Sequence, residues 1–118
     1  MSTRTNVGSV EDLHASATKA CGLDDFGSDD DNYREALAVL LDSYTRDADL
    51  TEIGSKMNRF FVRNALVARL VSEAAFKQYP QHTDVAIERP IFVTGLPRTG
   101  TTVIHRLLTA DPAHQGLE

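Results

Sequence analysis

Residues 91–102 read Ile-Phe-Val-Thr-Gly-Leu-Pro-Arg-Thr-Gly-Thr-Thr, and this stretch constrains the fold more than any other. Its first four residues predict a short strand buried on both faces, as strands of parallel sheets are. Gly95 and Gly100 bracket the loop that follows, and a helix is predicted from Thr101 to about Ala110. A buried strand, a glycine loop and a helix in this order predict a fold of the α/β class.

The spacing in this glycine loop (residues 95–102) matches a nucleotide-binding pattern at all but one position. Loops that bind nucleoside triphosphates follow G-x-x-x-x-G-K-[ST]. Gly95 and Gly100 have the required spacing, and Thr102 fills the Ser/Thr position. Thr101 stands where the lysine belongs, and Arg98 supplies the one positive charge of the loop. The loop therefore predicts a phosphate site that differs from an ATP or GTP site.

The residue types of the glycine loop suit a phosphate or sulfate group. Backbone amides from about Thr99 to Thr102 lie at a predicted helix N-terminus, where unpaired donors and partial positive charge coincide. The hydroxyl groups of Thr99, Thr101 and Thr102 add donors. Pro97 stiffens the entrance, and Arg98 offers a permanent charge in a planar, bidentate geometry.

The preceding part of the chain has helical periodicity. A first helix is predicted to start at Ser9 and to stop at Gly22. A second runs from about Asn32 to Arg46, and a third from about Thr51 to Tyr79, before Pro80. The apolar positions of the second helix are Tyr33, Leu37, Leu40, Leu41 and Tyr44. The stripe of the third helix predicted to be buried is Ile53, Met57, Phe60, Phe61, Asn64, Val67, Leu70, Val71 and Ala74.

The single predicted strand indicates an incomplete sheet. A lone strand has no neighbour for its backbone hydrogen bonds, and a parallel neighbour needs a later crossover unit. We therefore expect the N-terminal part of a larger α/β protein. It would consist of a helical region, 1–86, and the first strand–loop–helix unit of an apparently truncated domain, 87–118.

Composition narrows the classes of partner. Apolar residues make up 42% of the chain, which is enough for a folded core. The net charge of −5 argues against nucleic acid, because phosphate backbones are held mainly by Lys and Arg. No run is long enough for a membrane span, and the N-terminal residues lack the apolar core of a signal peptide. Cys21 is the single cysteine and cannot form an internal disulfide, so we expect a reducing, cytoplasmic setting.

Two features of the third helix allow more than one interpretation. Lys56, Arg59 and Arg63 share a face that could meet an anionic ligand or lipid headgroup; a solvated helix face is the simpler interpretation. Phe60 and Phe61 could line a substrate pocket, but aromatic residues at helical spacing usually belong to a core.

No metal site is expected. The run Asp29–Asp31 could chelate a cation, but it lacks the glycine turn and distal glutamate of a calcium loop, so a helix cap in a solvated turn is preferred. The spacing of His14, His82 and His114 gives no ligand set with Cys21. His105 lies near the glycine loop, but three residues beyond Thr102 on the helix flank, which disfavours it as a general base.

The segment Pro97-Arg-Thr-Gly-Thr-Thr102, preceded by Ile91-Phe-Val-Thr-Gly95, resembles the 5′-phosphosulfate-binding loop of the sulfotransferases. The bacterial, notably actinobacterial, branch is the nearest match, and Asp111-Pro-Ala-His-Gln115 also fits it. The specific resemblance covers roughly residues 88–118. It implies a P-loop-like parallel-sheet fold and transfer of a sulfuryl group from 3′-phosphoadenosine 5′-phosphosulfate to a hydroxyl or amine.

The resemblance also implies roles for individual residues. Arg98 would neutralise charge on the departing phosphate and is the expected catalytic residue. Pro97 and the segment Thr99–Thr102 would join it in binding the 5′-phosphate, without a metal ion. Val103 departs from the aromatic residue of the animal cytosolic enzymes, so their acceptor and cofactor packing is not carried over. The family's 3′-phosphate site and general base lie in segments that follow this one.

Two other functions remain open at this point. One is a degenerate P-loop nucleotide-binding protein or kinase, against which Thr101 argues. The other is a catalytically inactive helical interaction fragment. As a sulfotransferase, the protein would act on a small-molecule, lipid or carbohydrate acceptor, and would pair with the rest of its domain or with a second copy. The 118 residues alone are expected to be inactive.

Overall fold

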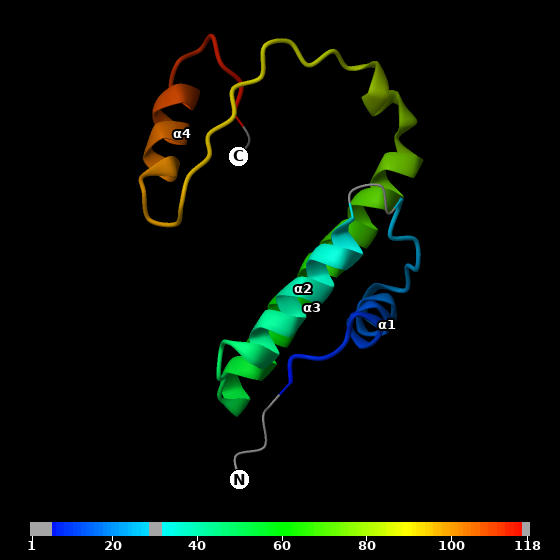
Figure 1. Cartoon of the computed structure of the whole chain (residues 1–118). Helices are drawn as coiled ribbons and strands as arrows, with labels where there is room; N and C mark the ends of the chain where they lie inside the picture. Colours follow the sequence, from blue (N-terminus) through cyan, green and yellow to red (C-terminus); the bar gives the residue numbers. More distant parts are fainter. Residues whose placement is uncertain (1–5, 29–31, 117–118) are drawn as a thin grey trace. The chain divides into compact units, whose positions relative to one another are not determined.

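The computed structural model describes residues 6–28 and 32–116. The chain divides into two compact units, Met1–Thr83 and Asp84–Glu118. The elements are the α-helices α1 (Val10–Cys21), α2 (Tyr33–Arg46), α3 (Glu52–Gln78) and α4 (Thr101–Thr109), with a short 3₁₀ helix η1 (Pro80–Asp84) after α3 (Figure 1).

The boundaries of α1 follow from local capping. The Ser9 side chain accepts a hydrogen bond from the backbone N–H of Asp12 at 3.1 Å, which satisfies one orphan donor of the first turn. At the other end Gly22 has φ 74°, and its N–H donates to the carbonyl of Thr18. Few residues other than glycine adopt this left-handed conformation without strain. Both predicted ends of the helix are confirmed.

The two longer helices also lie where the sequence predicts them. Asn32 precedes α2, which ends at Arg46. Thr51 caps α3 by accepting from the N–H of Gly54 at 3.1 Å. The third helix ends at Gln78, two residues before Pro80, whose ring and missing N–H prevent continuation.

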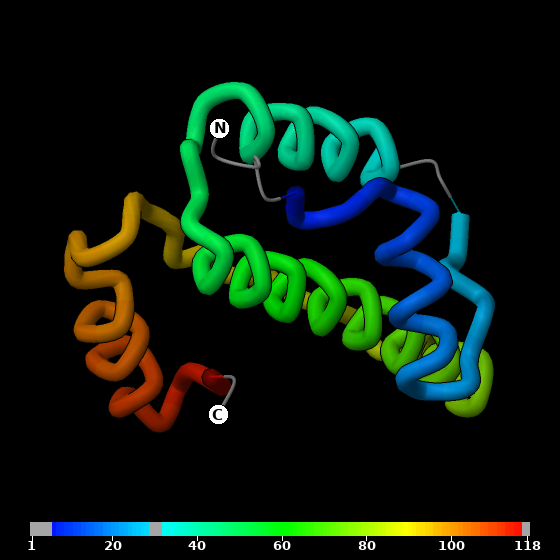
Figure 2. The backbone as a smooth tube through the Cα atoms, turned by 90° about the horizontal axis from the view of Figure 1, so that it is seen from below, coloured from blue at the N-terminus to red at the C-terminus, as the bar shows by residue number. Residues whose placement is uncertain are grey.

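The first unit has a small apolar core in which α1 packs against α3 and also touches α2 (Figure 2). Every described member of this core comes from these helices or from the segment just before α1. Its buried members are Val7, Leu13, Ala17, Leu37, Leu41, Leu66 and Leu70. Of the apolar positions of α2, Leu37 and Leu41 are therefore buried, whereas Leu40 is 40% exposed.

The predicted orientation of α3 is wrong for most of the stripe, although Leu70 is buried and Val67 packs against the core. The buried positions of this helix are Ser55, Leu66 and Leu70. Among the residues predicted to be buried, Leu70 alone is fully enclosed, while Ile53 is 72% exposed. The physical reason is that α1 packs on the side of α3 that carries Ser55 and Leu66, roughly opposite to the larger apolar side chains.

The predicted strand at 91–94 is not formed within residues 6–28 and 32–116, and Figure 1 shows this stretch as part of a long loop. Ile91 is 58% exposed and Phe92 is 84% exposed, whereas the sequence predicts both to be buried. A strand needs a neighbour to accept its backbone hydrogen bonds, and the described residues supply none. The structure is therefore helical, and the strand of the predicted α/β unit is not shown.

The predicted helix after the loop is confirmed as α4, Thr101–Thr109. Its apolar side chains remain accessible, with Val103 61% and Leu107 68% exposed. None of the described helices is both long and apolar enough to cross a membrane.

Candidate functional site

The glycine loop turns back on itself closely at its first residue. A Cβ atom added at Gly95 would lie 2.8 Å from Oγ1 of Thr99 and 3.1 Å from Cγ2 of Thr101. Real Cβ atoms do not approach another atom as closely as the first of these distances, so any side chain at position 95 would displace the loop. The structure thus brings together Gly95, Thr99 and Thr101, which the sequence places in one site.

A turn at Pro97 and Arg98 forms the tip of the loop. Arg98 has φ 68°, a left-handed conformation that is uncommon outside glycine. The hydroxyl of Thr99 donates to the carbonyl of Leu96 at 2.6 Å and closes this turn. In this conformation the Thr99 hydroxyl hydrogen is already used, so Thr99 offers an oxygen acceptor and its backbone amide, rather than the extra donor that the sequence suggests.

The first turn of α4 presents backbone donors. Gly100 is the residue before the helix, has φ 95° and contributes no side-chain cap. Its carbonyl accepts from the N–H groups of Val103 and Ile104, at 3.0 and 3.1 Å. The amides of Thr101 and Thr102 precede these donors in the first turn, where N–H groups lack an acceptor within the helix. Their unpaired donors and the partial positive charge of the helix terminus suit an anion.

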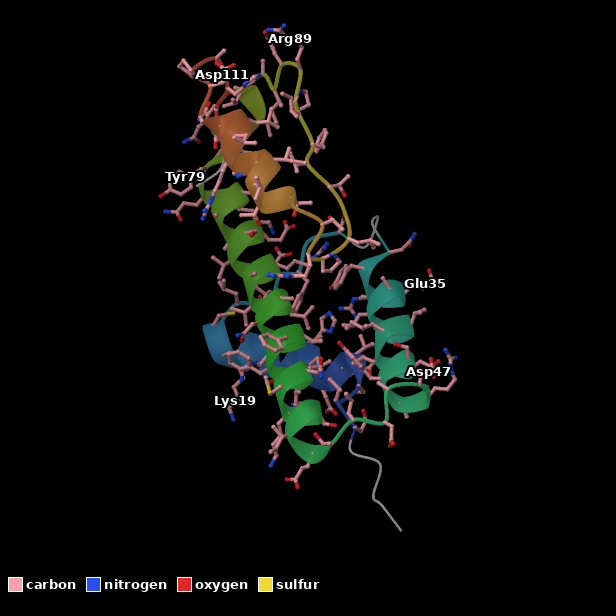
Figure 3. All side chains as sticks on the ribbon, turned by 90° about the vertical axis from the view of Figure 1, so that its left-hand side faces the viewer. Lys19, Glu35, Asp47, Tyr79, Arg89 and Asp111 are labelled. Carbon is pink, nitrogen blue, oxygen red and sulfur yellow. The ribbon has the colours of Figure 1, made fainter. Side chains whose placement is uncertain are left out.

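The charged group of the loop is accessible. The side chain of Arg98 is exposed, and no carboxylate in residues 6–28 or 32–116 forms an ion pair with it. Arg89, at the bend of the segment that leads to the loop, is also exposed (Figure 3). Arg98 lies within the turn that Thr99 closes, whereas Arg89 lies six positions before Gly95. An arginine inside the turn is placed to meet an anion bound by the same loop.

His105 lies one turn along α4 from the glycine loop, close to Gly116. Its ring atom Nε2 would lie 3.7 Å from a Cβ atom on Gly116, and Thr109 packs against the same glycine. The His105 side chain therefore faces the segment that follows α4.

The three basic residues of α3 do not form one solvated face, so that interpretation is wrong. Arg59 is half-buried, and its Nη1 donates to the carbonyl of Val7 at 3.0 Å. Arg63 is half-buried and lies over the ring of Phe60, 5.3 Å from its centroid. Lys56 is exposed and forms an ion pair with Glu52 at 2.6 Å. Each of the three contacts a neighbour within the described residues, although Nε of Arg63 is buried without a hydrogen-bond partner.

Phe60 and Phe61 are not core residues either. They are 51% and 58% exposed, and with Ile53, Lys56 and Met57 they line an open groove of about 350 Å³ on the surface of α3. Within the described residues they are therefore not part of a core.

A polar cluster that the sequence did not indicate lies inside the helical unit. His14 is 8% exposed; its Nδ1 bonds to the carbonyl of Val10 and its Nε2 to the hydroxyl of Tyr33. Arg69 lies over the Tyr33 ring, with Cζ 3.9 Å from the centroid. The spacing of His14, four residues after Val10 and beside Leu13, was the one available signal for its burial. The cluster has a structural role, because its groups satisfy one another.

The described residues contain no group of three His, Cys, Asp or Glu side chains that could hold a metal ion. The run Asp29–Asp31, considered as a chelating segment, lies outside the described residues.

Known proteins are similar to this chain in the segment that contains the glycine loop. A model of the sulfotransferase family matches residues 90–118, which contain the whole loop and α4. The crystal structure of sulfotransferase STF1 from Mycobacterium tuberculosis H37Rv is similar to this chain with a TM-score of 0.89 and 74% sequence identity. The match covers 97% of this chain and 31% of the STF1 chain. No curated protein matches the chain significantly.

The loop, the helix that follows it and these similarities define the class: the chain belongs to the sulfotransferase family. It spans about a third of the length of the solved relative that it matches.

Proposed function

We propose that this chain forms the 5′-phosphosulfate-binding part of a sulfotransferase that uses 3′-phosphoadenosine 5′-phosphosulfate as donor and a hydroxyl or amine as acceptor. The observation that carries the proposal is the glycine loop. Between a closely packed Gly95 and the uncapped first turn of α4, it holds an exposed arginine without an ion-pair partner among the described residues. The loop also lies within the segment that matches the family.

In this proposal Pro97, Gly100 and the three threonines Thr99, Thr101 and Thr102 bind the donor's 5′-phosphate, chiefly through backbone amides and hydroxyl groups. As the acceptor oxygen or nitrogen bonds to sulfur, the bond between sulfur and the bridging phosphate oxygen breaks. Negative charge then grows on the phosphate. Arg98 stabilises this charge, which favours the transition state over the bound donor and so raises turnover. No metal ion is required for these steps.

The domain assignment belongs to the same proposal. Residues 1–86 form a helical N-terminal region, and residues 87–118 begin the sulfotransferase domain. The acceptor is a small molecule, a lipid or a carbohydrate, and the setting is cytoplasmic. The donor's 3′-phosphate and the general base need residues outside this chain, so the 118 residues alone transfer no sulfuryl group.

The test uses a chimaera in which these 118 residues replace the matching part of STF1, hereafter the STF1 chimaera. We expect isothermal titration calorimetry to show binding of adenosine 3′,5′-bisphosphate without magnesium. A folded chimaera that fails to bind it would contradict the proposal, and magnesium-dependent binding of ATP instead would support a nucleotide-binding protein or kinase. Sulfuryl transfer by the isolated chain would contradict the assignment of its missing parts.

A further inference from the structure

The third helix has a second apolar face that the helical unit leaves uncovered. This outer face of α3 consists of Ile53, Met57, Phe60, Phe61 and Val71, which are between 51% and 72% exposed. Four of them, at 53, 57, 60 and 71, fall in one stripe at 100° per residue, with Phe61 at its edge. The stripe lies opposite the side of Ser55 and Leu66 that packs toward α1.

A helix with apolar residues on two sides is usually buried on both. A surface helix typically carries one apolar stripe and a polar opposite face. The outer face of α3 is instead hollowed into a groove lined by Ile53, Met57, Phe60, Phe61 and the stem of Lys56. Contiguous exposed apolar surface rimmed by polar groups marks an interface.

The charge around the groove favours an apolar occupant. Lys56 is the one cation in its lining, and it is paired with Glu52 at 2.6 Å. An anionic ligand or lipid headgroup would have to compete with that carboxylate. Packed hydrocarbon requires no such exchange, because the ammonium stays at the rim and its stem covers apolar surface.

The occupant of this groove can be inferred from the part of STF1 that this chain does not match. The chain reproduces its part of STF1 with a TM-score of 0.89, while the greater part of STF1 has no counterpart here. We infer that the outer face of α3 is the surface on which the remainder of the sulfotransferase domain, absent from this chain, packs against the helical region. This inference rests on membership of the family and not on the proposed donor chemistry.

The double substitution Phe60→Ser with Phe61→Ser tests the inference in two backgrounds. In the isolated chain both side chains are already about half exposed, so we expect the thermal unfolding midpoint to fall by less than about 5 °C. In the STF1 chimaera the same change should lower the midpoint by at least about 5 °C, since two buried aromatic side chains would be lost. Val39→Ser, at a 65% exposed position of α2, should leave both proteins unchanged.

Further measurements separate the other possible occupants. Equal shifts in the two backgrounds, or no shift in either, would overturn the inference. A dimer of the isolated chain that dissociates in the double variant, seen by light scattering, would assign the face to a second copy. An unchanged midpoint of the chimaera with a raised KM for apolar acceptors would assign it to substrate.

If the double variant of the chimaera does not fold, Phe60→Leu should fold with a midpoint close to that of the parent, because it preserves apolar contact. All the unfolding measurements are made without the sulfuryl donor. They therefore still test this inference if the proposed function proves wrong.

Discussion

His14 and Tyr33 lie 3.0 Å apart through Nε2 and the phenol oxygen, and this hydrogen bond joins α1 to the start of α2. The other ring nitrogen, Nδ1, lies 2.7 Å from the carbonyl of Val10. A carbonyl oxygen can only accept, so Nδ1 carries a hydrogen, and in the neutral ring Nε2 accepts from Tyr33. Two helices are thus held by a polar contact at the edge of a small apolar core.

Removing the Tyr33 hydroxyl should weaken the helical unit. We expect Tyr33→Phe to lower the free energy of unfolding by about 1–3 kcal/mol, because His14 would keep a buried nitrogen without its partner. Chemical denaturation followed by circular dichroism measures the change. Tyr44→Phe is the matched control: Tyr44 is half-buried on the same helix, and no described residue bonds its hydroxyl, so its effect should be within about 0.5 kcal/mol.

Arg69 should be sensitive to replacement by lysine. Its Nε donates to the carbonyl of Phe26 at 2.6 Å, and its Nη2 donates to that of Ser28 at 2.9 Å, while the guanidinium covers the Tyr33 ring. A lysine cannot make this planar fork and stack together, so Arg69→Lys should cost about 1–3 kcal/mol of unfolding free energy.

The control for that experiment is an exposed arginine. Hydrogen bonding to Asp47, and then the charge of Asp42, raises the pKa of Arg46, but both ion pairs lie in solvent. Arg46→Lys should leave the unfolding midpoint unchanged, since exposed ion pairs contribute little. Equal losses for the two arginines would contradict a specific role for Arg69.

Two adjacent residues of α3 show which side of this helix faces the core. Leu70 is fully buried, whereas Val71 is 52% exposed. In the isolated chain Leu70→Ala should therefore cost about 2–5 kcal/mol, from lost burial and the cavity left behind. Val71→Ala should cost less than about 1 kcal/mol. Urea denaturation of both variants checks the difference, and the reverse order would mean that the helix is rotated to the orientation that its sequence pattern suggests.

Gly95→Ala should disturb the glycine loop without unfolding the chain. The new Cβ would meet Oγ1 of Thr99 at 2.8 Å, so the loop must shift its hydroxyl or backbone. We expect the affinity of the STF1 chimaera for adenosine 3′,5′-bisphosphate to fall at least about tenfold, a loss of about 1.4 kcal/mol. Gly54→Ala provides the control, because its Cβ would make a similarly tight contact, 3.2 Å from Oγ1 of Thr51, at the start of α3 and outside the glycine loop. An unchanged affinity for the Gly95 variant would contradict the proposed role of the loop.

Arg98→Ala should reduce turnover more than donor binding. Loss of one group that stabilises transition-state charge typically costs a factor of about 10²–10³ in kcat. Arg98→Lys should recover part of this loss, since it restores the charge without the bidentate geometry. Steady-state kinetics of the STF1 chimaera measure kcat and KM for the donor separately, and Arg89→Ala serves as the control. A rise in KM at constant kcat would instead assign Arg98 to binding alone.

Local signals predicted the helices well. Ser9 and Gly22 define α1, and Thr51 defines the start of α3, because caps act within one turn and need no distant partner. The same holds for α4, which starts directly after Gly100. The close contact between Gly95 and the threonines of the loop also follows from a motif whose residues are few positions apart.

Features that depend on distant contacts were not predictable in the same way. Both sides of α3 carry apolar residues, so the sequence pattern could not decide which side is buried. It led to the prediction that the side with Phe60 and Phe61 is buried. The choice was made by α1, which packs against the side of Leu66. The strand at 91–94 failed for a related reason: its formation needs a neighbouring strand that the described residues do not contain.

The hydrogen bond between Thr99 and Leu96 has a consequence for how a ligand would be received. It spans three residues, and the packing of Gly95 against Thr101 spans six, so the loop takes its shape from its own sequence even where no sheet is formed beside it. A loop that is ordered beforehand loses little conformational entropy when an anion arrives. In the proposed function the loop would thus be preorganised for its anion, and the rest of the domain would supply selectivity for the remainder of the donor rather than the shape of the loop.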